Sequence, residues 1–167
     1  MAKIQSAEIR VERFSRTSSE SFEKVVEGLE RGIGHPEMIA FFQRITAAAG
    51  LAELESAVQE ATGPSGLMEF ARFDMGGVLR KEQGDKARKS LRLLVGNPIV
   101  MKEMVKYVPD AASYAPVTIL IDERADGVHL SYDRMASFLA PCGNAEALTV
   151  ARDLDAKIEA LLAQAAS

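Results

Sequence analysis

The spacing of apolar residues first indicates a helix near the start of the chain. These residues recur at helical intervals from Phe22 to Leu29, directly after Thr17-Ser18-Ser19-Glu20. That tetrapeptide matches a capping box, with a hydroxyl at the cap and a carboxylate three residues later. We therefore predict a helix that starts at Thr17 and ends near Gly32 and Gly34, because glycine readily adopts the positive φ of many helix ends.

The next segment, residues 35–63, predicts a pair of helices. Pro36 suits the first turn of one helix, whose apolar stripe includes Phe42. A second stripe runs from Leu51 to Val58, and Gly50 separates the two. We expect an antiparallel helical pair inserted into the fold, which is either a lid or a local addition to the core.

Short apolar runs with two-residue or β-branched patterns predict the strands. The pattern indicates strands at Ile9–Phe14, Leu67–Phe73, Leu91–Val95 and Val117–Ile121. We interpret Gly76-Gly77 as a bulge, after which the second of these strands continues.

A hairpin is predicted where the last run ends. Asp126-Gly127 is a two-residue turn signal, and it predicts a return strand in which Tyr132 pairs with Ile121. On that register, one face of the sheet carries Asp122, Arg124, His129 and Ser131.

Two helices are predicted in the second half of the chain. Gly96-Asn97-Pro98 starts one of them, with Asn97 as its cap. The other extends from about Ala145 to Leu162, and Asn144 is its cap. Its core-facing stripe consists of Val150, Leu154, Ile158 and Leu161, and we expect Arg152, Asp153, Asp155 and Glu159 to face water mostly.

The order of these elements is β-α-(α-α)-β-β-α-β-β-α. Mixed helices and strands with a tight hairpin indicate the α+β class, with a curved, largely antiparallel sheet and helices packed on one face. The length of 167 residues fits a single domain over residues 1–167, with residues 35–63 as the inserted helical pair.

The composition of the chain limits the classes of partner that it can bind. The 20 basic and 24 acidic residues leave a formal charge of −4, which argues against nucleic-acid binding. No apolar run approaches the roughly 20 residues that cross a bilayer, and residues 1–8 hold no apolar signal core. We therefore expect a soluble, cytoplasmic protein with no membrane partner.

Residues 80–92 depart from the acidic balance. They hold six cations and two carboxylates, a net charge of +4. Two interpretations stay open, because such a segment is either a solvated loop with a strand edge or a clamp for an anionic ligand or partner.

An ordered series of residues in the second half carries a resemblance to a known family. The series is Gly96-Asn97-Pro98, Met101, Met104, Pro109, Tyr114-Ala115-Pro116, Val117–Ile121, Gly127, Tyr132-Asp133, Ser137, Leu154-Asp155 and Lys157. It resembles the family catalogued as domain of unknown function 302, over about residues 68–165. Family members often carry Pro-Ser-Ser after the Tyr-Asp pair, whereas only Ser137 fits that run here.

The resemblance implies a fold similar to the TATA-binding-protein-like class, with a long C-terminal helix across a curved sheet. It also implies homodimers. It does not imply DNA binding, because this fold class hosts unrelated functions.

Candidate catalytic groups are sparse. No Cys or His cluster has metal-ligand spacing, so we predict no metal site, and the sequence identifies no cofactor. His129 shares a predicted sheet face with Asp122 and Ser131, which are ingredients of acid–base or nucleophilic chemistry. Cys142 precedes the last helix, and a thiol near a helix N-terminus is a candidate nucleophile. Both residues also have ordinary structural interpretations, as a solvated sheet residue and a small buried side chain.

Our leading hypothesis is a dimeric module that binds a small anionic or amphipathic molecule between sheet and helices. Tyrosine and methionine side chains suit the lining of such a cavity, and a helix start with nearby cations suits an anion. The candidate ligand-binding residues are Tyr114, Tyr132, Asn97 and Arg92. The alternatives are an enzyme or sulfur carrier that uses Cys142 or His129, and a purely structural or interaction dimer.

Overall fold

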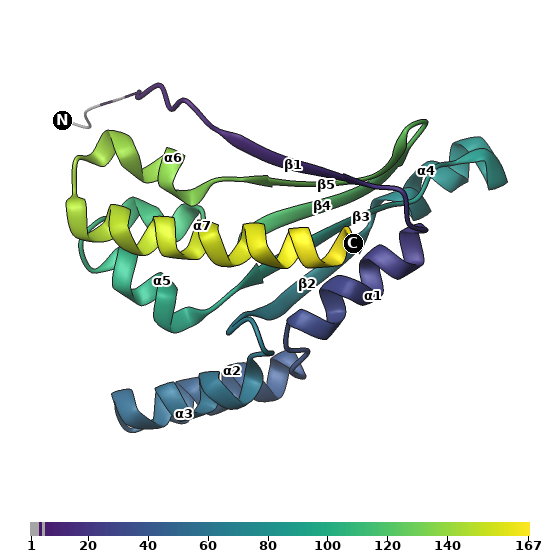
Figure 1. Ribbon diagram of the computed structural model, residues 1–167. Helices are drawn as coiled ribbons and strands as arrows, with labels where there is room; N and C mark the ends of the chain where they lie inside the picture. Colours follow the sequence, from purple (N-terminus) through teal and green to yellow (C-terminus); the bar gives the residue numbers. More distant parts are fainter. Residues whose placement is uncertain (1–3, 5) are drawn as a thin grey trace.

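A computed structural model describes residue 4 and residues 6–167, and it places the chain around a five-stranded antiparallel sheet (Figure 1). Part of the segment that lacks a signal core, residues 1–3 and 5, lies outside the described residues. The strand order is β1-β5-β4-β3-β2, so the first and last strands of the chain are neighbours. The strands are β1 (Arg13–Ser18), β2 (Met68–Asp74), β3 (Ser90–Gly96), β4 (Val117–Arg124) and β5 (Gly127–Asp133).

The helices lie between these strands and after the last one along the chain. The α-helices are α1 (Phe22–Gly32), α2 (Met38–Ala47), α3 (Leu51–Ala61), α4 (Met75–Gln83), α5 (Pro98–Val105), α6 (Met135–Leu139) and α7 (Ala145–Ala165). Short 3₁₀ turns are η1 (Gly84–Lys86), η2 (Pro109–Ser113) and η3 (Ala140–Cys142). The predicted α+β class and the long C-terminal helix are confirmed. No helix among the described residues is both long and apolar enough to cross a bilayer.

The main core lies between the sheet and α7, which packs against α1, α5 and α6 (Figure 1). In β4, Ile119 and Ile121 are fully buried on this side, whereas Thr118 on the other side is exposed. Asn144 caps α7 as predicted, because its side chain accepts a hydrogen bond from the backbone N–H of Ala147. The predicted stripe of α7 is buried at Leu154, Ile158 and Leu161 and half-buried at Val150.

The predicted bounds of the first strand and the first helix are wrong by several residues. The first strand covers Arg13–Ser18 instead of Ile9–Phe14, and α1 begins after Ser21, whose side chain accepts from the N–H of Lys24. Pairing of six residues with β5 outweighs the local capping signal at Thr17–Glu20.

The predicted bulge at Gly76-Gly77 is also wrong, because the chain forms α4 there. Asp74 caps this helix by accepting a hydrogen bond from the N–H of Gly77 at 2.7 Å. A side chain at Gly76 would lie 2.8 Å from the backbone nitrogen of Ser90, so glycine lets α4 pack closely on the approach to β3.

The β4–β5 hairpin forms, but its register differs by two residues from the prediction. Tyr132 pairs with Ile119 rather than Ile121, and the turn residues are Ala125-Asp126. Gly127, with φ +136°, lies in β5, where a Cβ would come within 2.5 Å of the carbonyl oxygen of Ser18. A shift of two residues preserves the face of each side chain.

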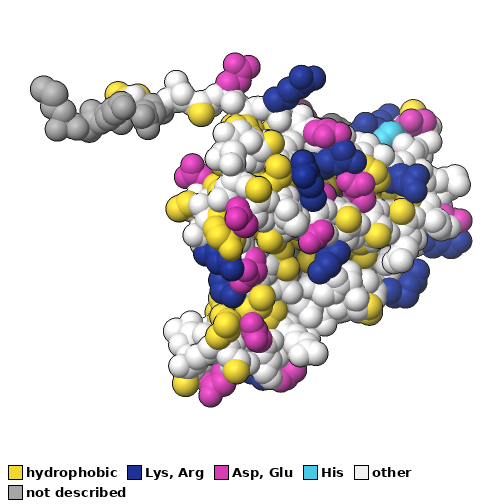
Figure 2. Space-filling view, turned by 60° about the vertical axis from the view of Figure 1, so that its left-hand side comes forward, with side chains coloured by type: hydrophobic (Ala, Val, Ile, Leu, Met, Phe, Trp, Pro, Cys, Tyr) yellow, Lys and Arg dark blue, Asp and Glu magenta, His cyan; other side chains and the backbone are white. Residues whose placement is uncertain are grey.

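Helices α2 and α3 form the expected pair beside the edge strand β2 (Figure 1). Gly34 joins the pair to the sheet, because its N–H donates to Leu67 and its carbonyl accepts from Glu69, both at 2.9 Å. The pair shares with β2 a small separate core of Phe41, Val58 and Met68. In Figure 2, apolar side chains are exposed above the lower lobe that this pair forms.

Candidate functional site

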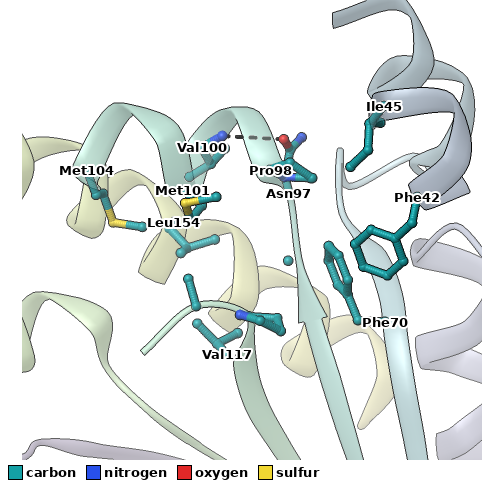
Figure 3. A pocket seen from close by; sticks show the side chains of 13 residues that line it. Phe42, Ile45, Phe70, Asn97, Pro98, Val100, Met101, Met104, Val117 and Leu154 are labelled. Atoms are coloured by element: carbon teal, nitrogen blue, oxygen red, sulfur yellow. Dashed lines mark hydrogen bonds between the residues drawn. The ribbon is translucent and has the colours of Figure 1, made fainter. Parts of the chain in front are cut away.

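An apolar hollow lies at one end of the sheet, between α2, α5 and α7 (Figure 3). It contains about 580 Å³ of empty space, part of which is open to solvent. Helix α2 contributes one wall, β2 and β3 the floor, and the start of α5 the opposite wall. The lining consists of Phe42, Ile45, Phe70, Gly96, Asn97, Pro98, Val100, Met101, Met104, Ala115, Pro116, Val117 and Leu154. We call it the end hollow.

Asn97 is the one polar side chain of this lining, and its amide is already occupied. The side-chain oxygen accepts from the backbone N–H groups of Ile99 and Val100, at 2.8 and 3.3 Å. The side-chain nitrogen donates to the carbonyl of Gly66 at 2.8 Å. The predicted capping role of Asn97 is confirmed, and the lining offers no charged side chain to a ligand.

Aromatic and sulfur-containing side chains shape the end hollow. The ring of Phe42, on α2, faces that of Phe70, on β2, with centroids 6.4 Å apart (Figure 3). Phe42 is half exposed, so it belongs to the wall of the end hollow rather than to the core. Met101 and Met104 reach the hollow from α5, and methionine adapts its shape to varied apolar partners.

Two other predicted ligand-binding residues meet in a second, more polar hollow. Arg92 and Tyr114 both line it, and the Tyr114 ring stacks on Phe138 with centroids 4.5 Å apart. The Arg92 guanidinium donates to the hydroxyl of Thr118 at 3.4 Å. Ala115–Val117 line both hollows, but Asn97 lines only the end hollow. The structure therefore divides the predicted ligand-binding set.

Tyr132, the fourth member of that set, is buried and lines neither hollow. Its hydroxyl donates to the carboxylate of Asp155 at 2.5 Å. The same carboxylate accepts from the backbone N–H groups of Met135 and Ala136, at 2.7 and 3.1 Å. The expectation that Asp155 faces water is thus wrong. Burial raises the pKa of Asp155, and these hydrogen bonds oppose that effect only in part.

Helical spacing alone would have predicted the burial of Asp155, whereas its charge favoured exposure to water. Ala151, Asp155 and Ile158 are four and three residues apart, so they share the buried face of α7. Burial also raises the pKa of Tyr132, and the neighbouring Asp155 charge adds to this effect.

The candidate catalytic residues are not assembled into a connected group. His129 lies opposite Asp122 in the sheet, but its Nε2 contacts Asp126 at 2.8 Å. The Asp122 carboxylate instead accepts from Arg124 at 2.6 Å. Ser131 pairs with Ser15 and Leu120 across the strands.

Cys142 is exposed in η3, two residues before the Asn144 cap of α7. Within the described residues, no cluster of three or more His, Cys, Asp or Glu side chains is arranged to hold a metal ion.

These features define an α+β protein whose antiparallel sheet packs under a long C-terminal helix and ends in an apolar hollow. A family model for the domain of unknown function DUF302 matches residues 43–165, and the chain belongs to this family. The crystal structure of an uncharacterized conserved DUF302 protein from Bacillus stearothermophilus is similar, with a TM-score of 0.63 and 12% identity. The match covers 92% of this chain and 97% of that chain. No curated protein matches the sequence.

Proposed function

We propose that the protein binds a small amphipathic molecule, whose apolar part occupies the end hollow. The observation that carries the proposal is the lining itself, which is apolar except for an asparagine whose amide has its own partners. Transfer of apolar surface from water into such a hollow is favourable by about 25 cal/mol per Å². An ion buried there would lose its hydration without gaining a partner.

The anionic or polar end of the ligand therefore stays outside the end hollow. Asn97 contributes as the cap that fixes the start of α5, and not as a direct polar contact. Phe42 and Ile45 on α2 form one wall of the end hollow, in line with a lid role for the inserted helical pair. Ligand sites in proteins commonly combine such apolar walls with a few polar groups at the rim.

A fluorescence titration tests this proposal. The probe is 1-anilinonaphthalene-8-sulfonate, an amphipathic anion whose emission rises in apolar surroundings. Met101→Trp fills the end hollow, and we expect it to weaken probe binding at least tenfold, a change of about 1.4 kcal/mol. Tyr107→Trp is the matched control, because Tyr107 follows α5 and is exposed outside the lining.

A second variant keeps the test valid if Met101→Trp disturbs folding. Phe42 is half exposed, so Phe42→Ala removes part of the wall while the main core stays intact. We expect weaker probe binding with unchanged circular dichroism. Equal affinity in the wild type and both hollow variants would exclude the end hollow as the site.

We also propose a homodimer, which the family resemblance implies. Sedimentation equilibrium tests this part, because it measures the mass of the protein in solution. Chemistry at Cys142 is the alternative function. Its exposure in η3 makes native thiol labelling a direct measure of its reactivity.

A further inference from the structure

Helix α4 exposes an apolar surface that the end hollow does not explain. Met75, Val78 and Leu79 are 43%, 67% and 40% exposed, and their spacing puts them on one side of the helix. Phe73, at the end of β2, is 44% exposed. We call these four residues the α4 patch. In Figure 1, α4 projects from the end of the sheet that lies opposite α5 and α6.

The way α4 packs explains why the patch faces outward. Gly76 is the one buried residue of the helix, and it lies against the backbone of residues 88–90. That close contact fixes the orientation of α4, in which Met75, Val78 and Leu79 stay exposed. Exposed apolar surface that is grouped in this way marks an interaction site.

Cations are frequent in the segment that forms and follows the α4 patch. Arg80 and Lys89 are paired with Asp74 and Glu23. Four more cations in this region have no carboxylate within 4.0 Å among the described residues, and they are Lys81, Lys86, Arg88 and Arg92. The Arg92 guanidinium lies over the Phe73 ring, 5.8 Å from its centroid.

The acidic groups of the segment, Glu82 and Asp85, leave residues 80–92 with a net charge of +4. More distant carboxylates act weakly on a partner at this end, because the Debye length is about 8 Å at physiological ionic strength.

We propose that the α4 patch and its cations bind the surface of an anionic lipid bilayer. A projecting helix with apolar residues between cations matches the interfacial region of such a bilayer, where apolar side chains enter the headgroup boundary and cations contact anionic headgroups. Charge complementarity selects anionic lipid, and the projecting shape favours a broad soft surface over a shaped groove. This proposal departs from the expectation of no membrane partner, which rested on the lack of a spanning segment and of a signal core, because a surface contact needs neither. This proposal is independent of the end hollow.

Vesicle co-sedimentation of the full chain tests the proposal. We expect binding to equimolar phosphatidylglycerol and phosphatidylcholine vesicles, weakened by added salt, and little binding to phosphatidylcholine alone. Val78→Glu places a charge in the α4 patch and should reduce binding at least tenfold. Ile39→Glu is its matched control, because Ile39 is an equally exposed apolar residue on α2, where binding should stay unchanged.

A second pair of variants tests the charges. The double variant Lys86→Gln and Arg88→Gln should weaken binding about 30-fold, as about 1 kcal/mol per cation implies. The control Arg152→Gln and Lys157→Gln, on exposed positions of α7, should leave binding unchanged. All four positions are exposed, so loss of folding does not confuse the result.

Three outcomes would overturn the proposal. They are no binding to the anionic vesicles, equal binding to both vesicle types, and equal binding by the wild type and Val78→Glu. A wild-type dimer that Val78→Glu converts to a monomer, without vesicle binding by either, would instead assign the α4 patch to contact between copies of this chain.

Discussion

At the scale of single residues, Asp155 performs a capping role from a distant position in the sequence. Arg134 precedes α6 and makes no side-chain hydrogen bond as its cap. The first N–H groups of α6, from Met135 and Ala136, instead donate to Asp155 on α7. One carboxylate thus ties α6 to α7 and also accepts the Tyr132 hydroxyl from β5.

This arrangement predicts a specific pH dependence of stability. The unfolded chain ionises Asp155 near pH 3.9, whereas burial raises the pKa of the folded state above its ordinary value. The contribution of the titration is complete at low pH and declines as the pH rises through the folded pKa. We therefore expect the stability difference between wild type and Asp155→Asn to shift against the wild type as the pH rises from about 4.

Urea unfolding across a pH series measures this difference. Asp153→Asn is the control, because Asp153 is exposed on the same helix and should show no such trend. A difference that is constant with pH, or that moves in favour of the wild type, would contradict the burial of a carboxylate with a raised pKa.

The role of a side chain can be predicted from the sequence when its hydrogen-bond partners are close by in the chain. Asn97 and Asn144 each precede the first residue of a helix and accept from backbone N–H groups two or three residues later, so the local sequence is enough to identify them as caps. Asp155 finds its partners about 20 residues away, across a turn of the chain. Its charge suggested exposure, and the tertiary hydrogen bonds reverse that expectation.

At the scale of elements, Gly34 is the junction between the α2–α3 pair and the sheet. A Cβ at this position would lie 2.0 Å from the carbonyl oxygen of Ala61 and 2.8 Å from the backbone nitrogen of Gly63. Backbone atoms cannot move aside as a flexible side chain can. The end of α3 and the strand β2 therefore approach closely only because residue 34 lacks a side chain.

We expect Gly34→Ser to destabilise the protein by about 3 kcal/mol, because overpacking against backbone must displace α3. Gly50→Ser carries the same chemical change to the cap of α3, where no atom lies within 4 Å of a new Cβ. That control should change the free energy of unfolding by less than about 0.5 kcal/mol. Equal denaturation midpoints for the two variants would show that the junction tolerates a side chain.

Element types follow from the sequence more reliably than their ends. The α2–α3 pair, α7 and the β4–β5 hairpin have patterns long enough to predict them. The start of α1 and the hairpin register were wrong because both depend on pairing with distant strands, β5 in the first case and β1 in the second. The end hollow was beyond prediction for the same reason, since α2, β3, α5 and α7 meet there.

At the scale of the whole molecule, the two apolar clusters differ greatly in size. The main cluster joins β1, β3, β4 and β5 with α7, whereas the cluster that α2 and α3 share with β2 has three buried residues. We expect hydrogen exchange to show faster opening in α2 and α3 than in β3, β4 and α7, because local stability follows buried apolar contact. Equal protection in both regions would contradict this and would argue against a lid that opens.

The pairing of β1 with β5 has a consequence for the nascent chain. Arg13 and Asp133 are 120 residues apart, yet they are neighbours in the sheet and form an ion pair at 2.6 Å. During translation, β1 leaves the ribosome first and has no partner until β5 has emerged. Throughout that interval its hydrogen-bonding groups depend on water or on a chaperone, and the final closure of the sheet is a late, long-range event.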